Sequence, residues 1–352
     1  MSLERFDRKG SFMTAVSRRE FVAGAAAAFA ALGALPLTGM AAEASAAKDK
    51  DAAAKAASGK ADSAAADAQP LPDLPIDESK ELMVQFVPTN NDGSLQAKAK
   101  PFGEYLSKKL GMKVEVTLAT DYSTIVEAMA SNQVNLGIMP PAAYVQARNM
   151  GVAKALLTSE LGAYDRETGK PIDGQLAGSF KGEVLCKADS DMQKFEDLKG
   201  KKIATLSPNS ASGYIYPVAE LKKKGVDPTI DCTLTTVNDI PSEMTAVLNG
   251  QQDACFVFEG ARNVFAGKFA DQDLFAELKV LYLTEGDIPN DAIAVLPGMD
   301  EETQKAIKNV FLHMNLDQEG ADAMAMWSHK GYTEVDETAY DTMQEYIDLA
   351  AE

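Results

Sequence analysis

The chain has few of the side chains that most catalytic and metal sites need. Its 352 residues include three cysteines, two histidines and one tryptophan. The cysteine spacing matches no metal-binding pattern, and the two histidines add no cluster of ligands. No glycine-rich dinucleotide fingerprint and no Gly-Lys-Ser phosphate loop occurs. We therefore predict no metal, no cofactor and no catalytic residue.

Basic side chains are also in the minority. Lys and Arg number 34 against 52 Asp and Glu, which gives a formal net charge of −18. This balance argues against nucleic acid and anionic membrane surfaces as partners. It does not argue against a local anion site, because charge is screened beyond about 10 Å while hydrogen-bond donors act at contact.

The amino-terminal residues read as an export signal followed by a linker. Arg18 and Arg19 precede an apolar run over residues 21–40, and small residues follow it. We interpret residues 1–46 as a signal peptide of the twin-arginine type, with an ordinary secretory signal as the alternative. Whether it is cleaved or kept as an anchor stays open. Residues 47–75 lack large apolar side chains and are predicted to be a disordered tether.

An odd number of cysteines leaves at least one thiol unpaired in an exported chain. Cys186, Cys232 and Cys255 each lie in an apolar, strand-like segment. We interpret them as buried free thiols that behave as small hydrophobic side chains.

Beyond residue 80, short apolar strands alternate with amphipathic helices, which predicts an α/β fold. The expected strands are 82–87, 113–118, 135–139, 153–158, 182–187, 202–206, 233–237, 254–258, 279–283 and 292–296. The expected helices are 95–110, 123–132, 141–149, 211–225, 241–250, 260–267, 301–313, 317–328 and 336–350.

The alternation breaks twice, at the polar stretches 163–182 and 284–291. The segment between the breaks has the size of an inserted domain. We predict a first domain of residues 76–180 plus 288–352 and a second of residues 181–287. The chain would cross between them near 178–182 and 284–291, with a ligand cleft between the two domains.

A turn rich in hydroxyl groups follows the expected strand 202–206. Ser207, Ser210 and Ser212 surround the start of the next helix, and Gly213 lets the backbone approach closely. The first amides of a helix lack partners within it and favour negative charge. The turn therefore predicts an oxyanion site, although an ordinary serine cap would have the same sequence.

Four stretches in fixed order carry a family resemblance: 119–122 opening a helix, 136–141 ending a strand, 195–202 leading into 207–214, and 288–291 at the second crossing. Residues 80–315 resemble the phosphate, phosphite and phosphonate-binding solute receptors of ABC importers. The resemblance implies the two-domain type II periplasmic-binding-protein fold, a small oxyanion ligand and a membrane permease as partner.

The resemblance also implies site residues. The oxyanion grip of the family matches Ser210, Ala211 and Ser212 with their backbone amides, helped by Tyr122 at the start of a helix. The family usually has threonine in place of Ala211 and an aromatic hydroxyl in place of Phe180. In this chain the backbone amides would therefore provide a larger share of the hydrogen bonds to the oxyanion.

Two carboxylates match positions that recognise the other end of the ligand in aminophosphonate receptors. They are Glu259 and Asp291. A pair of carboxylates suits an ammonium group and disfavours a free phosphate dianion. Glu259 could instead be an acidic residue in the first turn of the helix that follows it. Trp327 is interpreted as packing in the carboxy-terminal region.

The predicted function is that of an extracytoplasmic solute-binding protein, at the cell surface or in the periplasm and monomeric. It would bind a phosphonate, phosphite or phosphate for import by an ABC transporter. Two alternatives stay open: a receptor that feeds a membrane sensor, and a hydrolase acting on a small phospho-compound. Nucleophilic catalysis needs a base near the nucleophile, and neither histidine lies near the serine turn in the sequence.

Overall fold

The computed structural model describes residues 69–87, 94–166 and 168–352, all within one compact unit, Ala61–Glu352. The predicted signal peptide and residues 47–68 of the predicted tether lie outside the described residues. In the part of the chain that is described, no helix combines the length and the apolar composition needed to cross a bilayer.

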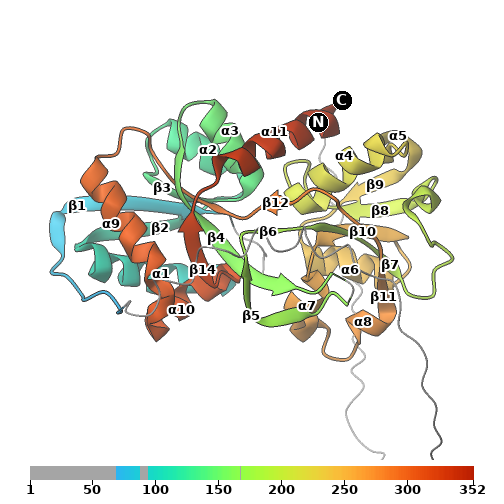
Figure 1. Ribbon diagram of the computed structural model, residues 1–352, viewed down its shortest axis with the longest axis horizontal. Helices are drawn as coiled ribbons and strands as arrows, with labels where there is room; N and C mark the ends of the chain where they lie inside the picture. Colours follow the sequence, from blue (N-terminus) through green and yellow to red (C-terminus); the bar gives the residue numbers. More distant parts are fainter. Residues whose placement is uncertain (1–68, 88–93, 167) are drawn as a thin grey trace, which may run out of the picture. The chain divides into compact units, whose positions relative to one another are not determined.

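The first of two large sheets has seven strands in the order β14-β4-β13-β3-β1-β2, and β5 pairs with β4 (Figure 1). Strands β1, β2 and β3 are mutually parallel, whereas β13 runs antiparallel to β3 and β4. The strands are β1 (Asp77–Phe86), β2 (Met112–Leu118), β3 (Leu136–Met139), β4 (Lys154–Tyr164), β5 (Pro171–Ala177), β13 (Ala292–Val295) and β14 (Gly331–Glu334).

Helices cover both faces of this sheet. Alternate residues of β1, such as Val84 and Phe86, are fully buried in one core with α1 and α9. The opposite face packs against α2, α3 and α11. The helices are α1 (Ser94–Leu110), α2 (Tyr122–Ala130), α3 (Pro141–Asn149), α9 (Glu301–Leu312), α10 (Gln318–Met324) and α11 (Glu337–Ala351), with 3-10 turns at Met314–Leu316 and Ala325–Trp327.

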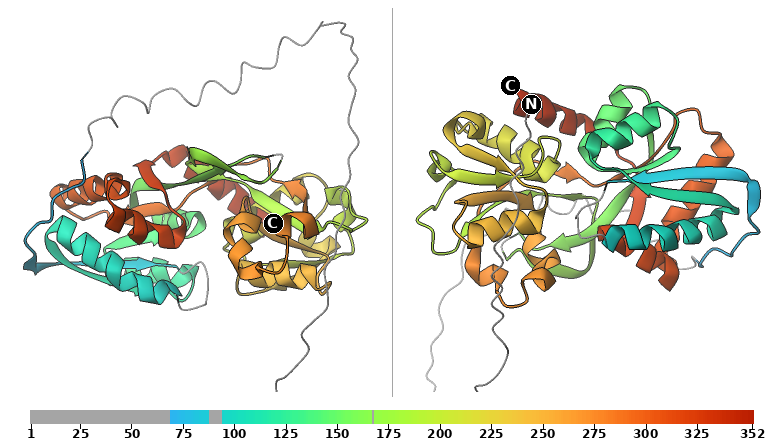
Figure 2. Two further views of the ribbon diagram at one scale, coloured as in Figure 1. Left: turned by 90° about the horizontal axis from the view of Figure 1, so that it is seen from below. Right: turned by 180° about the vertical axis from the view of Figure 1, so that it is seen from behind.

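The second sheet has five strands in the order β11-β7-β10-β8-β9 (labelled in Figure 1, with two further views in Figure 2). Strands β8, β9 and β10 are parallel, and β7 runs antiparallel to both of its neighbours. The strands are β7 (Gly182–Lys187), β8 (Lys202–Thr205), β9 (Thr233–Thr236), β10 (Ala254–Phe258) and β11 (Leu278–Leu283). The helices are α4 (Tyr216–Lys223), α5 (Pro228–Asp231), α6 (Ile240–Leu248), α7 (Ala261–Val264) and α8 (Leu274–Glu277), with 3-10 turns at Phe195–Leu198 and Ala266–Phe269 and a π-helical turn at Ala211–Ile215.

A small two-stranded sheet, β6 (Ser179–Phe180) with β12 (Ile288–Pro289), lies where the chain passes between the large sheets. Asn290 follows it and is 1% exposed. Its side-chain amide donates to the carbonyl oxygens of Ser159 and Ala177, both at 2.8 Å. The two passages are therefore held side by side by backbone and side-chain hydrogen bonds.

Helix α11 contacts elements of both large sheets, and Figure 1 shows it between α3 and α4. At one end the Tyr340 ring meets Tyr144 edge-on at 4.7 Å. At the other end Tyr346 stacks on Tyr216 of α4 at 4.0 Å. The phenol of Tyr346 donates to the carboxylate of Glu220 at 3.0 Å.

Glu220 is a buried carboxylate, 3% exposed, whose two oxygens are occupied by donors from the chain around it. Tyr282 donates to it at 2.6 Å, and the backbone amides of Glu285 and Gly286 donate at 2.8 and 2.7 Å. With Tyr346, Glu220 thus joins α4, β11, α11 and the second passage.

The expected elements are confirmed, because each expected strand and helix has a counterpart in the structure. The expected helix 211–225 begins as the π-helical turn at Ala211–Ile215 and continues as α4. The sequence analysis missed β5, β6, β12, β14, α5 and α8. The proposed bounds of the two domains stay a prediction.

The end of the predicted tether needs a correction, because its last residues contact the first sheet's helices. The backbone amide of Leu74 donates to Lys108 O at 2.7 Å, and Lys109 Nζ donates to Leu71 O at 2.7 Å. Lys109 also pairs with Asp73 at 2.9 Å, and Leu71 packs against the core under α1. The body begins near Leu71, where sequence composition alone suggested linker.

The cysteines are free thiols in the structure. Cys186 and Cys255 are buried in the neighbouring strands β7 and β10. Burial raises the pKa of both thiols. The half-buried Cys232 donates its thiol to Leu198 O at 3.1 Å.

Candidate functional site

The first sheet brings two of the predicted residues to one edge. Strands β1, β2 and β3 are parallel, so their carboxyl ends share this edge. Tyr122 begins α2 shortly after β2 ends, and Asp121 caps the helix by accepting from Thr124 N at 2.8 Å. Asp291 directly precedes β13, whose first residue pairs with Met139 at the end of β3. The antiparallel direction of β13 thus places Asp291 at the edge where β1 and β3 end.

The serine turn lies at the carboxyl end of β8 in the second sheet. The Ser210 amide donates to Ser207 O at 2.9 Å, which closes the turn. Ser210 then caps the following helix, since its hydroxyl accepts from Gly213 N at 3.2 Å. A side chain at Gly213 would lie 2.8 Å from Leu206, so the close approach requires glycine there.

The grip residues are mostly buried. Ser210 is 4% exposed, and Ala211 and Ser212 are each 7% exposed. The hydroxyl oxygen of Ser207 is buried without a hydrogen-bond partner. The first amides of this helix, those of Ala211 and Ser212, have no acceptor within it by helix geometry. The turn therefore offers hydroxyl and amide donors in one buried place.

Ser210 and Asp291 are both close enough to Tyr122 to influence its phenol. Burial raises the pKa of Tyr122 to about 12. Hydrogen bonding with the Ser210 side chain opposes this shift, and the negative charge of Asp291 adds to it. The structure thus brings together residues from both large sheets, and the Tyr122 phenol keeps its proton at neutral pH.

Glu259 has different neighbours. It follows β10 and is 7% exposed. Its Oε2 accepts from Lys181 N at 3.0 Å, and its own amide donates to Lys181 O at 2.8 Å. Burial raises the pKa of Glu259, while the amide of Lys181 and the charges of Arg166 and Lys181 lower it. Glu259 is therefore attached to the first passage between the sheets.

Phe180, at the position where the resemblance led us to expect an aromatic hydroxyl, lies in β6. Its ring meets the Phe258 ring edge-on with centroids 6.4 Å apart. This contact places Phe180 beside the end of β10 and close in sequence to Lys181, the partner of Glu259.

The sequence analysis missed the residues that surround Asp291. His329 is 1% exposed, and its Nε2 lies 3.4 Å from Asp291 Oδ2. The charge of Asp291 also contributes to the raised pKa values of Tyr332 and Tyr340, for which burial is the main cause. No sequence signal pairs Asp291 with a histidine 38 positions away, because β14 and the turn before it bring them together.

Trp327 packs in the core, as predicted. Its ring lies 4.8 Å from Phe86 and 4.9 Å from Phe102, both edge-on, and the residue is 6% exposed.

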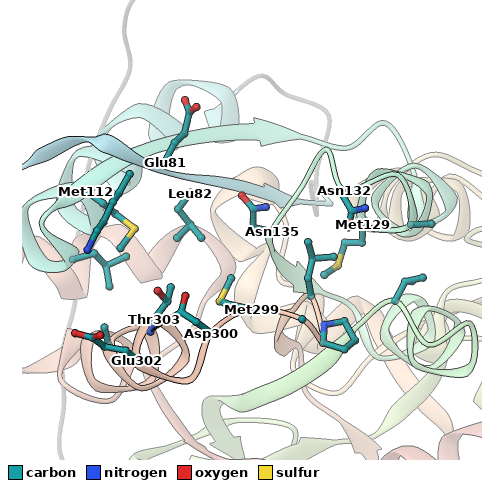
Figure 3. A pocket seen from close by; sticks show the side chains of 18 of the residues that line it. Glu81, Leu82, Met112, Met129, Asn132, Asn135, Met299, Asp300, Glu302 and Thr303 are labelled. Atoms are coloured by element: carbon teal, nitrogen blue, oxygen red, sulfur yellow. Dashed lines mark hydrogen bonds between the residues drawn. The ribbon is translucent and has the colours of Figure 1, made fainter.

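The groove in Figure 3 lies elsewhere on the first sheet and contains none of the predicted site residues. Its volume is about 1080 Å³, and its lining includes Leu82 of β1, Asn135 just before β3, and Met299 and Asp300 beyond β13. These positions belong to the edge opposite Asp291. In the residues that the structure describes, no three or more His, Cys, Asp or Glu side chains are placed to hold a metal ion.

The arrangement now described agrees with the comparison against known proteins. The family model for the periplasmic substrate-binding protein of phosphonate ABC transporters matches residues 84–340. The chain belongs to this family. Members are substrate-binding proteins of transport systems, and a periplasmic family implies a location outside the cytoplasm.

Relatives and solved structures are consistent with this membership. The phosphate-import protein PhnD of Mycolicibacterium smegmatis is 33% identical over 181 residues, which cover 49% of this chain and 53% of that protein. The match thus spans about half the length of that curated relative.

Two solved structures show the same fold. The binding component of an ABC phosphonate transporter from Pseudomonas aeruginosa superposes with a TM-score of 0.63 at 19% identity, covering 79% of this chain and 87% of that one. PhnD1 of Prochlorococcus marinus, in complex with methylphosphonate, gives a TM-score of 0.59 at 19% identity and covers 76% and 97%. The fold is that of the type II periplasmic binding proteins, as expected.

Proposed function

We propose that this protein binds a phosphonate-type oxyanion outside the cytoplasm and delivers it to the membrane permease of an ABC importer. The observation that carries the proposal is the meeting of Tyr122, Ser210 and Asp291, which come from both large sheets. A ligand held by both would favour a closed state of the two domains, which a permease can recognise.

The oxyanion end would lie on the serine turn. Ser210, Ser212 and the amides of Ala211 and Ser212 would donate to it, together with the protonated phenol of Tyr122. Two observations support this role: the buried Ser207 hydroxyl has no hydrogen-bond partner among the described residues, and burial keeps the pKa of Tyr122 at about 12.

The other end of the ligand would face the carboxylates. Asp291, whose side chain is 24% exposed, would receive an amino or other donor group. Glu259 would contribute a second and weaker contact, because its Oε2 already accepts from Lys181 N. This assignment favours a phosphonate with a donor group over a bare dianion.

Binding without catalysis fits the surroundings of the histidines. His329 contacts Asp291 and Tyr332, while His313 Nδ1 lies 2.8 Å from Asn309 O. Neither of these contacts involves the serine turn, so neither histidine is placed to act as the base for a serine nucleophile there. A hydrolase would release phosphate from model phosphonates or phosphoesters, and we expect no release.

Export by the twin-arginine route and a monomeric state complete the proposal. Replacing Arg18 and Arg19 by lysine should retain the precursor inside the cell, whereas unchanged export would indicate the general secretory route. A receptor that feeds a membrane sensor stays the second candidate, and genetic linkage to a permease or to a sensor separates the two.

Calorimetric titration of the purified protein tests the ligand class. The panel is methylphosphonate, 2-aminoethylphosphonate, phosphite, phosphate and methanesulfonate. We expect 2-aminoethylphosphonate to bind most tightly, and a ligand at 100 times its Kd should stabilise the fold by about 2.7 kcal/mol. Binding of the sulfonate alone, or of no member of the panel, would overturn the proposal.

A further inference from the structure

Asp291 contacts a group of buried side chains, Trp327, His329 and Tyr332, through His329. The Trp327 and His329 rings stack with centroids 5.5 Å apart and planes at 28°. His329 Nδ1 lies 3.2 Å from the Tyr332 phenol, and its Nε2 lies 3.4 Å from Asp291 Oδ2. His329 is 1% exposed, whereas the Asp291 side chain is 24% exposed. The imidazole is thus enclosed by protein, and the carboxylate has one side available to a ligand.

The partners of His329 allow two charge states. An ionised carboxylate only accepts hydrogen bonds, so Nε2 carries a proton toward Asp291. The phenol of Tyr332 both donates and accepts, so it satisfies Nδ1 whether that nitrogen is bare or protonated. Burial raises the pKa of Tyr332, which therefore stays neutral.

Glu160 of β4 is an acid close to the turn that carries His329, with its carboxylate beside Gly331, and burial raises its pKa. The groups whose pKa responds to the Asp291 charge are phenols. Tyr122 of α2, Tyr332 of β14 and Tyr340 of α11 all respond to the Asp291 charge, and burial raises the pKa of each. Tyr105 of α1 lies near Tyr332 and also has a pKa raised by burial. Among the described residues, His329 is the cation-forming side chain within 4 Å of Asp291.

We propose that His329 is a positioning residue that aims the Asp291 carboxylate at the ligand and sets the net charge of that wall of the site. With neutral imidazole the wall carries one negative charge and favours a ligand with an ammonium group. With imidazolium the pair is neutral, and a bare oxyanion loses less binding. The inference rests on the proposed function and adds a determinant of selectivity to it.

The measured quantity is the ratio of the Kd for methylphosphonate to the Kd for 2-aminoethylphosphonate, between pH 5.5 and 8.5. In the unaltered protein this ratio should be higher where the imidazole is neutral than where it is charged, because the wall then carries the full charge of Asp291. His329→Gln keeps a donor toward Asp291 without a titratable charge, so its ratio should change less with pH. The ligands titrate identically in both experiments, so their own protonation cancels in the comparison.

His329→Leu removes both the donor and the charge. We expect its selectivity at pH 7.5 to fall about tenfold, because a charge-assisted hydrogen bond no longer orients the carboxylate. If His329→Gln recovers part of the selectivity, the loss in His329→Leu comes from the orientation of the Asp291 carboxylate and not from a change in packing. The control is His313→Gln, which should leave the ratio and its pH dependence unchanged.

A measurement on the unaltered protein guards against variants that fail to fold. Two histidines give two imidazole signals in a carbon-proton correlation spectrum, and His313→Gln identifies them. The His329 signal should shift when 2-aminoethylphosphonate binds, and Asp291→Asn should reduce this shift. An unmoved signal, or the same selectivity in His329→Leu and the unaltered protein, would overturn the inference. If no phosphorus oxyanion binds at all, the proposed function itself fails.

Discussion

Asp291 and Glu259 look alike in sequence but differ in the structure. Each is an acidic residue next to an apolar strand, and each was predicted to face the ligand. Asp291 lies among phenols and one imidazole, with a quarter of its side chain exposed. Glu259 has one oxygen on the Lys181 amide and lies near the positive charges of Lys181 and Arg166.

The difference teaches that the neighbours of a carboxylate decide how much of its charge is available to a ligand. An oxygen that accepts from the backbone is already neutralised in part and fixed in place. Asp291 keeps more of its hydrogen-bonding capacity, so we propose it as the main contact. The predictions below test this ordering of the two acids.

The largest effect should come from a carboxylate that the chain occupies completely. Glu220 accepts from two phenols and two backbone amides, so Glu220→Gln would replace one acceptor oxygen by an amide nitrogen that cannot accept from the phenol and the backbone amide donating there. We expect the free energy of unfolding to fall by about 3 kcal/mol, measured by denaturant titration. As control, Glu319→Gln removes an exposed pair with Lys108 and should cost less than about 1 kcal/mol. Equal losses would show that the buried contacts add little.

Substitutions in the serine turn should weaken the binding of all ligands by similar factors. Ser210→Ala or Ser212→Ala removes a hydroxyl donor, which we expect to cost about 1 to 3 kcal/mol of binding, up to roughly a hundredfold in Kd. Calorimetry with methylphosphonate and 2-aminoethylphosphonate should show similar losses for both. A loss confined to one of them would place the oxyanion elsewhere.

Two matched substitutions test whether Asp291 contributes more to ligand binding than Glu259 does. Asp291→Asn should weaken 2-aminoethylphosphonate about tenfold or more and spare methylphosphonate, because an amide receives a cation poorly. Glu259→Gln should act in the same direction by less than about threefold. If Glu259→Gln weakens every anion equally, Glu259 is a structural support and the two-carboxylate site is wrong.

A smaller effect is expected on the pH dependence of stability, from two buried acids outside the proposed ligand site. Glu243 is fully buried with both oxygens unpartnered, and burial raises its pKa well above the usual value. Burial also raises the pKa of Glu183 to about 7, although Arg262 lies close. Both folded-state values exceed the unfolded ones, so the folded state binds more protons and stability falls as pH rises. The window for Glu183 is about pH 4.5 to 7.

Urea unfolding at pH 4.5, 6 and 7.5 measures this dependence. The slope should be flatter in Glu243→Gln and in Glu183→Gln than in the unaltered protein. A slope that is the same in both variants as in the unaltered protein would contradict the raised pKa values of these two acids.

The sequence predicted the fold where local pattern and tertiary structure agree. Apolar strands such as β10 and the helix start after β8 carry their signals within a few residues. Strands β6 and β12 have two residues each and exist through their pairing with each other, and β5 is mixed in composition and mostly exposed. The relation between His329 and Asp291 depends on β14 joining β4, which no local pattern encodes.

The most direct test of the account is a crystal structure of the protein with methylphosphonate. We predict that the phosphonate oxygens lie within hydrogen-bonding distance of the amides of Ala211 and Ser212, the Ser210 hydroxyl and the Tyr122 phenol, with Asp291 facing the methyl group. Methylphosphonate bound away from the serine turn, for example in the groove of Figure 3, would contradict the account.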